Sequence, residues 1–323
     1  MQMENVPLDE AVGAILVHNI ADAQGHKLFA KGHALSAEDI EKLRGVRHEL
    51  YVARLAPGEV RENEAVQRIA RALGGENVSF SPPNTGRMNA LATVRGVFQV
   101  NAEMLNRVNG IAGITLATIP AHRVVEAKKM VATYKTIGLA LLESSLQELE
   151  ALGRESGPIL TVRPLRAMQV VVILTGSGEA QKRVHETFTH PIQSRVEELG
   201  GRVISLHYVP EEPAAIAGAI TQATQSGAQC IILAGETSIM DRDDITPRGI
   251  EAAGGVVELY GAPVEPGNLL LLAYHGTIPI IGAPGCIKSR DTNVVDLILP
   301  RLLTGECIAR ADVIALANGG LLL

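Results

Sequence analysis

Tryptophan is absent from this 323-residue sequence, and aromatic residues make up only 3% of it. Proteins that bind nucleic acid usually present stacking rings or a basic surface. This chain has instead a formal net charge of −6. We therefore expect no nucleic-acid partner.

Cysteine and long apolar stretches are also scarce. The three cysteines, Cys230, Cys286 and Cys307, are too few and too scattered for a disulfide framework or a CxxC metal site. No stretch approaches twenty apolar residues, and the first thirty residues contain four acids where a signal peptide needs an apolar core. These absences predict a cytoplasmic protein without a membrane partner.

A polar, helix-breaking segment divides the sequence. Arg154–Pro158 and Arg163-Pro164 precede the apolar run Met168–Leu174, and the chain is long enough for two domains. We predict an α+β N-terminal region at residues 1–160 and an α/β domain at residues 166–323. In the N-terminal region the patterns predict helices at Leu8–Ile20, Ala37–Leu43 and Glu143–Leu152, and strands at Glu49–Arg54, Leu91–Val100, Ile114–Ile119 and Val131–Thr136.

Beyond the boundary, apolar runs alternate with amphipathic helical segments. Ile192, Val196 and Leu199 share one helical face, Pro213 opens a second helix, and Pro247–Ala253 gives a third. Short strand-like runs lie between these segments, and Leu269–Ala273 with Ile278–Ile281 predicts a hairpin. This alternation predicts a three-layer α/β/α domain with a mostly parallel sheet.

The most informative stretch is residues 230–250. Branched residues at 231–233 suit a strand buried on both faces, and Thr246-Pro247 suits a helix N-cap followed by a first-turn proline. The acids Asp241, Asp243 and Asp244 lie between them, where ligands bind in open α/β sheets. By themselves these acids are equally consistent with a solvated loop or with a charge at the helix start.

Six short segments of this half follow one another in a distinctive order. They are Thr175–Glu179, Glu198–Gly200, Val209–Pro213, Ala234–Ser238, Asp243–Pro247 and Gly282–Gly285. Taken together they resemble the molybdopterin-binding domain of molybdenum cofactor biosynthesis proteins, and the resemblance covers about residues 168–305. In the N-terminal half, Val6–Ala11, Asn84–Asn89 and Val131–Thr133 are similar to a subfamily related to the molybdotransferases and often associated with molybdenum hydroxylases.

The chain departs from the family pattern at several of these places. Glu236 stands where a small residue usually follows two glycines, and Glu211 stands where an aspartate is usual. Cys286-Ile287 follows Gly285 in place of Asn-Pro. The substitution of Glu211 for aspartate therefore retains a carboxylate on a side chain of different length.

The resemblance implies molybdopterin as the ligand and assigns candidate roles. Asp243, Asp244 and Glu211 are the catalytic candidates, and Asp241, Asp243 and Asp244 are the candidates for holding Mg²⁺. Backbone N–H groups at glycine turns suit the phosphate, and the two cations Lys288 and Arg290 are otherwise ordinary surface charges. The cofactor-binding candidates are Gly176, Ser177, Gly178, Gly235, Thr237, Ser238, Thr246, Pro284, Gly285, Lys288 and Arg290.

Two classes of function follow from the resemblance. The first is a transferase that inserts molybdate into molybdopterin or activates its phosphate with ATP, in the manner of a molybdotransferase or an adenylyltransferase. The second is a non-catalytic carrier or sensor of the molybdenum cofactor that serves a molybdenum hydroxylase. The resemblance also implies a homo-oligomer, and it predicts that the turns at Gly176–Gly178, Gly235–Ser238 and Gly285–Arg290 converge in space.

Overall fold

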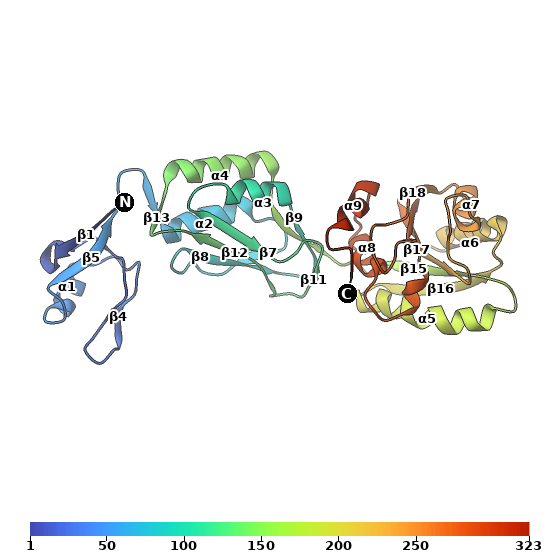
Figure 1. The fold of residues 1–323 in the computed structure, drawn as a ribbon, viewed down its shortest axis with the longest axis horizontal. Helices are drawn as coiled ribbons and strands as arrows, with labels where there is room; N and C mark the ends of the chain where they lie inside the picture. The colour runs from blue at the N-terminus through green and yellow to red at the C-terminus, as the bar shows by residue number, and fades with distance from the viewer. Residues whose placement is uncertain (323) are drawn as a thin grey trace. The chain divides into compact units, whose positions relative to one another are not determined.

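The computed structural model describes residues 1–322, so the final residue of the predicted 166–323 domain lies outside the described part. The chain divides into two compact units, Met1–Arg163 and Pro164–Leu323 (Figure 1). No helix within residues 1–322 is long and apolar enough to cross a membrane.

The C-terminal unit is built on one six-stranded sheet with the order β16-β15-β17-β20-β19-β18. β15, β16, β17 and β20 are parallel, and β18 and β19 add an antiparallel edge. The strands are β15 (Gln169–Thr175), β16 (Arg202–Val209), β17 (Cys230–Gly235), β18 (Val256–Tyr260), β19 (Leu271–His275) and β20 (Ile278–Gly282). The helices are α5 (Gln181–Glu198), α6 (Pro213–Gln225), α7 (Ile245–Ala252), α8 (Val294–Leu302) and α9 (Arg310–Ile314), with a 3₁₀ turn at Gly285–Lys288.

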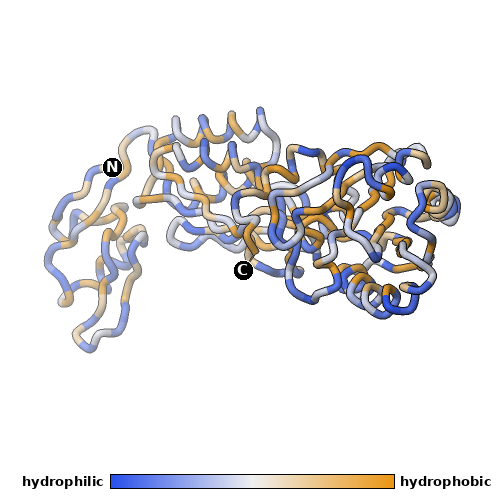
Figure 2. The backbone as a smooth tube through the Cα atoms, turned by 45° about the vertical axis from the view of Figure 1, so that its right-hand side comes forward, coloured by the Kyte–Doolittle hydropathy of each residue, from blue (hydrophilic) through white to orange (hydrophobic). Residues whose placement is uncertain are grey.

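Helices cover both faces of this sheet because its central strands are apolar on both sides. In β15, Val170 and Val172 pack toward α5 and α8, whereas Val171 and Ile173 pack toward α6 and α7. Successive residues of a strand point to opposite faces, so an unbroken run of branched residues serves two cores at once. Apolar segments run through the interior of this unit (Figure 2). The predicted three-layer α/β/α domain is confirmed.

One predicted boundary in this unit is wrong. α7 begins at Ile245, and its N-cap is Asp244, whose Oδ1 accepts from the Ile245 N–H at 2.7 Å. Thr246 and Pro247 therefore lie inside the first turn. The sequence contained two capping residues in close succession, and the earlier one forms the cap.

The N-terminal unit is a mixture of small antiparallel sheets and helices. Its strands pair in the orders β1-β5-β2, β3-β4, β13-β6, β10-β12-β8-β7 and β11-β9-β14. The helices are α1 (Ala37–Leu43), α2 (Glu62–Leu73), α3 (Ala102–Asn109) and α4 (Glu143–Ser156). The strands are β1 (Gln2–Pro7), β2 (Ile15–Leu16), β3 (Ile20–Ala21), β4 (Lys27–Phe29), β5 (Glu49–Arg54), β6 (Glu59–Arg61), β7 (Val78–Phe80), β8 (Arg87–Ala92), β9 (Gly96–Val100), β10 (Ile114–Thr118), β11 (Val124–Val125), β12 (Met130–Thr136), β13 (Ala140–Leu142) and β14 (Leu160–Pro164).

Two predicted elements of this unit are wrong. The predicted helix Leu8–Ile20 is instead a short 3₁₀ turn followed by β2 and β3. Gly13 adopts a φ of +79°, which no right-handed helix contains, and β2 pairs with β5. The predicted strand Leu91–Val100 is two strands in different sheets, because the chain turns between Ala92 and Gly96.

Candidate functional site at the carboxyl edge of the sheet

The carboxyl ends of the parallel strands lie at one edge of the C-terminal sheet. Thr175 at the end of β15 pairs with Val209 of β16 on one side and with Gly235 of β17 on the other. Gly282 at the end of β20 pairs with Leu233 of β17. The turns that follow these strands contain most of the predicted site residues, so the topology places those residues at this edge.

Glu211 joins the turn after β16 to the turn after β17. Its Oε1 accepts from the Thr237 N–H at 3.1 Å, and its two oxygens each lie 3.0 Å from the Thr237 hydroxyl. The Thr175 hydroxyl lies 3.4 Å from the same Oε1. A side chain at Gly235 would not fit here, because its Cβ would lie 2.1 Å from Thr175 Oγ1. Glu211 therefore orders the glycine turn after β17.

Glu236 makes the equivalent link to the turn after β15. Its Oε2 accepts from the N–H of Ser177 at 3.1 Å and from the Ser177 hydroxyl at 3.0 Å, and its Oε1 accepts from Arg183 of α5 at 2.5 Å. The Ser177 N–H, helped by the Ser177 hydroxyl and by Arg183, holds the pKa of Glu236 below its usual value. Glu236, which departs from the family pattern, therefore accepts a hydrogen bond from the Ser177 N–H, one of the backbone donors predicted to bind phosphate.

Gly176 lies where no larger residue fits. A Cβ at this position would lie 2.5 Å from the Tyr208 hydroxyl and 3.2 Å from Glu236 Oε2. The Tyr208 hydroxyl donates to the Ser177 carbonyl at 2.6 Å, and burial raises the pKa of Tyr208, with Glu236 and Glu211 acting in the same direction. The turn after β15 is thus held by Tyr208 of β16 as well as by Glu236, which follows β17.

The turn after β20 approaches the turn after β17. A Cβ at Gly285 would lie 3.5 Å from Ser238 Oγ and 4.0 Å from Lys288 Nζ, and Pro284 is buried as the N-cap of the 3₁₀ turn. The Lys288 ammonium lies 5.6 Å from the ring centroid of Phe188 on α5. Lys288 is thereby placed beside the glycine turns.

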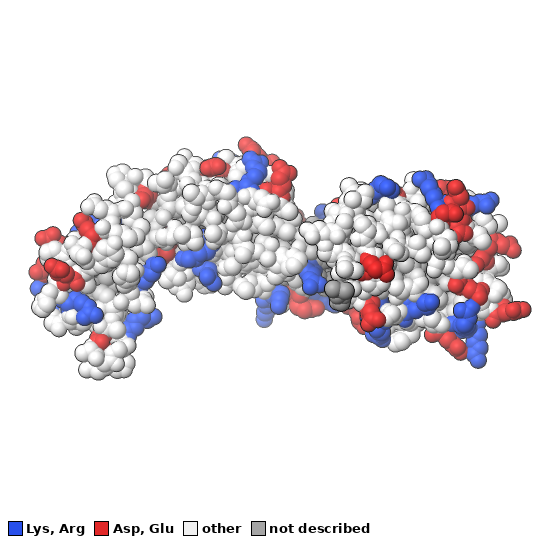
Figure 3. Space-filling view, in the orientation of Figure 1, with Lys and Arg blue, Asp and Glu red and all other residues white. Residues whose placement is uncertain are grey.

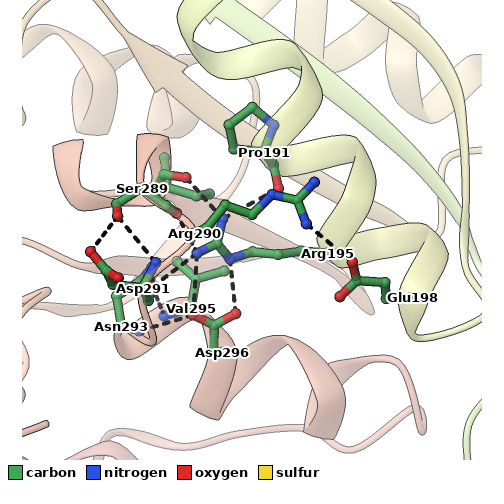
Figure 4. Close-up of polar contacts among 10 residues, drawn as sticks. Pro191, Arg195, Glu198, Ser289, Arg290, Asp291, Asn293, Val295 and Asp296 are labelled. Atoms are coloured by element: carbon green, nitrogen blue, oxygen red, sulfur yellow. Dashed lines mark hydrogen bonds and ion pairs between the residues drawn. The ribbon is translucent and has the colours of Figure 1, made fainter.

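Arg290 is placed elsewhere. Its guanidinium contacts the second half of α5, with Glu198 Oε1 at 3.4 Å (Figure 4). His190 Nε2 lies at 2.9 Å and Ser194 Oγ at 3.2 Å from the same guanidinium. The structure brings Lys288 to the glycine turns but does not bring Arg290 there.

Arg195 causes the different placement of Lys288 and Arg290, and the sequence analysis did not identify it. It is 8% exposed, and its guanidinium donates to the carbonyls of Ile287 at 2.9 Å, Ser289 at 2.7 Å and Asp291 at 3.2 Å, while Asp296 Oδ1 accepts from its Nε at 2.8 Å (Figure 4). The Ser289 and Asp291 carbonyls that flank Arg290 both point to Arg195. The available signal was an arginine beside the buried face of a predicted helix, where a charge needs buried partners.

The three acids of the loop make different contacts. Asp244 Oδ1 caps α7 and its Oδ2 accepts from the Met240 N–H at 2.9 Å, while Asp241 Oδ1 accepts from the Asp243 N–H at 2.7 Å. No group of three or more His, Cys, Asp or Glu side chains within residues 1–322 is arranged to hold a metal ion. Two of the three carboxylates therefore make hydrogen bonds within the loop itself. Asp243 is exposed.

Donors suited to an anion are nevertheless present at this edge. The backbone N–H groups of Gly178 and Ser238 have no acceptor among the described residues, and Lys288 lies near the second of them. Acidic and basic side chains are interspersed over the visible face of this unit (Figure 3). An anionic ligand would therefore be attracted by these local donors rather than by a broad positive surface.

The family comparison matches the segment that contains this edge of the sheet. Residues 171–304 match the model of a probable molybdopterin binding domain, and residues 5–54 match a domain of unknown function (DUF8806). The matched segment of the first model lies within the C-terminal unit, so this unit is similar to molybdopterin-binding domains. No curated protein matches the chain.

Several solved structures are similar to parts of the chain. A putative molybdenum cofactor biosynthesis protein from Corynebacterium diphtheriae is 19% identical, with 43% of this chain and 95% of that chain covered and a TM-score of 0.33. The molybdopterin biosynthesis enzyme MoaB from Thermus thermophilus is 18% identical, with coverages of 43% and 98% and a TM-score of 0.32. The molybdopterin biosynthesis protein MoeA from Pyrococcus horikoshii is 14% identical, with coverages of 97% and 75% and a TM-score of 0.28.

Proposed function

We propose that the carboxyl edge of the C-terminal sheet binds molybdopterin during molybdenum cofactor biosynthesis. The observation that supports this most directly is the meeting of three turns, after β15, β17 and β20, inside the segment that matches the family model. Ligands of open α/β sheets bind outside the carboxyl ends of the strands.

The donors at this edge divide between the two ends of the ligand. The N–H groups of Gly178 and Ser238, with the Lys288 ammonium, suit its phosphate. The Asp243 carboxylate is exposed and suits the N–H donors of a pterin edge. Bound molybdopterin would supply a dithiolene for the metal, and the protein's part is to bind and orient it.

The first role we propose is transfer chemistry, in which molybdate is inserted or the phosphate is adenylated from ATP. The second is a carrier or sensor that delivers the cofactor to a molybdenum enzyme, with a homo-oligomer as the working form in either case. The second role is favoured by the use of Asp244 as a helix cap and of Asp241 within its own loop, because Mg²⁺-dependent transfer needs free carboxylates.

The binding site is tested by one pair of variants and one ligand. Molybdopterin binding, followed by pterin fluorescence under anaerobic conditions, should weaken about tenfold in K288A, since a charged hydrogen bond contributes ~1.5 kcal/mol. R290A removes the same kind of charge two residues away and should bind as the wild type does, because Arg290 contacts α5. Equal affinities in K288A and the wild type would contradict the proposed site.

The role is tested separately with the wild-type protein. Protein and molybdopterin are incubated with ATP, Mg²⁺ and molybdate, and the product is analysed by mass spectrometry. Adenylated or metallated product identifies a transferase. Bound but unchanged molybdopterin identifies a carrier.

A further inference from the structure

We propose that Ser177 and Arg183 form an oxyanion pocket that Glu236 fills in the absence of ligand, and that a phosphate monoester dianion displaces Glu236. The inference rests on the proposed function, because it concerns the same edge of the sheet. It adds Arg183 as a ligand-binding residue and Glu236 as the residue that sets selectivity.

Three donors converge on the Glu236 carboxylate from two elements. The Ser177 N–H and hydroxyl both donate to Oε2, at 3.1 Å and 3.0 Å, and Arg183 donates to Oε1 at 2.5 Å. A backbone N–H, a hydroxyl and a guanidinium are the donors that proteins use for phosphate. The side-chain carboxylate therefore marks a place already shaped for a small oxyanion.

The Ser177 turn is held in place without help from Glu236. The Tyr208 hydroxyl donates to the Ser177 carbonyl at 2.6 Å, the Ala180 N–H donates to the same carbonyl at 3.1 Å, and the Gly176 N–H donates to the Val209 carbonyl at 3.2 Å. These bonds fix the peptide groups on both sides of Ser177. When the Glu236 side chain leaves, the Ser177 N–H keeps its position and loses its anion.

Selectivity follows from competition between two anions. Glu236 has one negative charge and is tethered to the site, so a free carboxylate gains little by replacing it. A phosphate monoester has up to two charges and three terminal oxygens at neutral pH. The additional oxygens can reach Arg183, which is 65% exposed, and the Gly178 N–H, which has no acceptor among the described residues. The pocket therefore favours a dianion over a monoanion.

The test uses inorganic phosphate as the probe and isothermal titration calorimetry at constant ionic strength. E236A should bind phosphate at least tenfold more tightly than the wild type, because the tethered competitor is gone. The control is E186A, which removes an acid of α5 that pairs with Lys182 at 3.9 Å and leaves the Ser177 turn alone. Its affinity for phosphate should stay within twofold of the wild type.

Two further variants isolate the pocket. R183A/E236A should lose the gain in phosphate affinity, and E236Q, which keeps the size of the side chain without its charge, should show most of that gain. Acetate should bind E236A at least tenfold more weakly than phosphate. The proposal is overturned if E236A and E186A bind phosphate equally, if R183A/E236A retains the gain, or if acetate equals phosphate.

Failure of this inference and failure of the proposed function give different results. A gain of phosphate affinity in E236A with no molybdopterin binding in the wild type would keep the pocket and reject the proposed ligand. Molybdopterin binding with no gain in E236A would keep the proposed ligand and reject the role of Glu236.

Discussion

Replacement of Arg195 by methionine should destabilise the C-terminal unit more than any exposed charge change in it. The guanidinium donates to three carbonyls of the segment after β20 and forms an ion pair with Asp296. Methionine retains much of the volume but none of the donors. The carbonyl of Ile287 is buried and would lose its donor, which alone costs about 1–3 kcal/mol.

The total destabilisation in R195M should exceed the cost of the lost hydrogen bond to Ile287 but stay below the largest cost of a broken buried ion pair. Breaking a buried ion pair from one side costs about 3–5 kcal/mol. The side chain of Asp296 is 29% exposed, so water restores part of its solvation. We expect a loss of about 3 kcal/mol in the free energy of unfolding. With a urea m-value of about 2 kcal/mol/M, the midpoint should fall by about 1.5 M.

The assay is urea denaturation followed by circular dichroism, with R290M as the matched control. Arg290 is exposed and pairs with Glu198 at the surface, so R290M should lose less than about 1 kcal/mol. Because the chain has two units, the transition of the N-terminal unit should not move. A loss below about 1 kcal/mol in R195M, or equal losses in the two variants, would refute this account of the segment.

Three further predictions concern single side chains, each measured by chemical or thermal denaturation. D244A should lose about 1 kcal/mol of unfolding free energy because it removes the cap of α7, whereas D244N should stay near the wild type; a D244A variant as stable as the wild type would mean that the cap contributes nothing. Y134F should leave the free energy of unfolding unchanged or raise it by up to about 1 kcal/mol, since the buried Tyr134 hydroxyl has no partner among residues 1–322. Y274F should lower it by about 1 kcal/mol, because the Tyr274 hydroxyl makes two hydrogen bonds to the backbone of Ile308. The reverse order of stabilities would contradict both assignments. The pKa of Glu236 is lowered, so its stabilising contribution is present at neutral pH and is lost as the pH falls through that pKa. The melting temperature should therefore fall more steeply below about pH 4.5 in the wild type than in E236Q. Parallel curves of melting temperature against pH would contradict this prediction.

The C-terminal fold could be predicted because its signals are local. The branched run of β15, the proline that opens α6 and the glycine that ends it each act within a few residues. The N-terminal unit was harder, since Leu8–Ile20 has helix-like apolar spacing while its chain direction is set by Gly13 and by pairing with the distant β5. Spacing reports which residues are buried, but the element that buries them is chosen by partners far away in sequence.

The side-chain contacts of the site could not be predicted from the sequence for the same reason. The sequence indicated the glycine turns, and parallel topology alone is enough to place them at one edge. It could not indicate that Glu236 bonds to Ser177, fifty-nine residues earlier in the chain, because a one-residue departure from a family pattern says nothing about where the side chain points. Arg290 was likewise grouped with Lys288 by proximity in sequence, although carbonyls held by Arg195 direct it to α5.

Helix α5 reaches the site at three points along its length. Arg183 lies in its first turn against Glu236, Phe188 lies under Lys288, and Arg195 holds the segment after β20. Arg183 and Arg195 are twelve residues apart, or about 18 Å along the helix axis, and Pro191 lies between them inside the helix. A shift of the whole helix would move the turns after β15 and β20 in concert, whereas a bend at Pro191 would move one of these turns without the other.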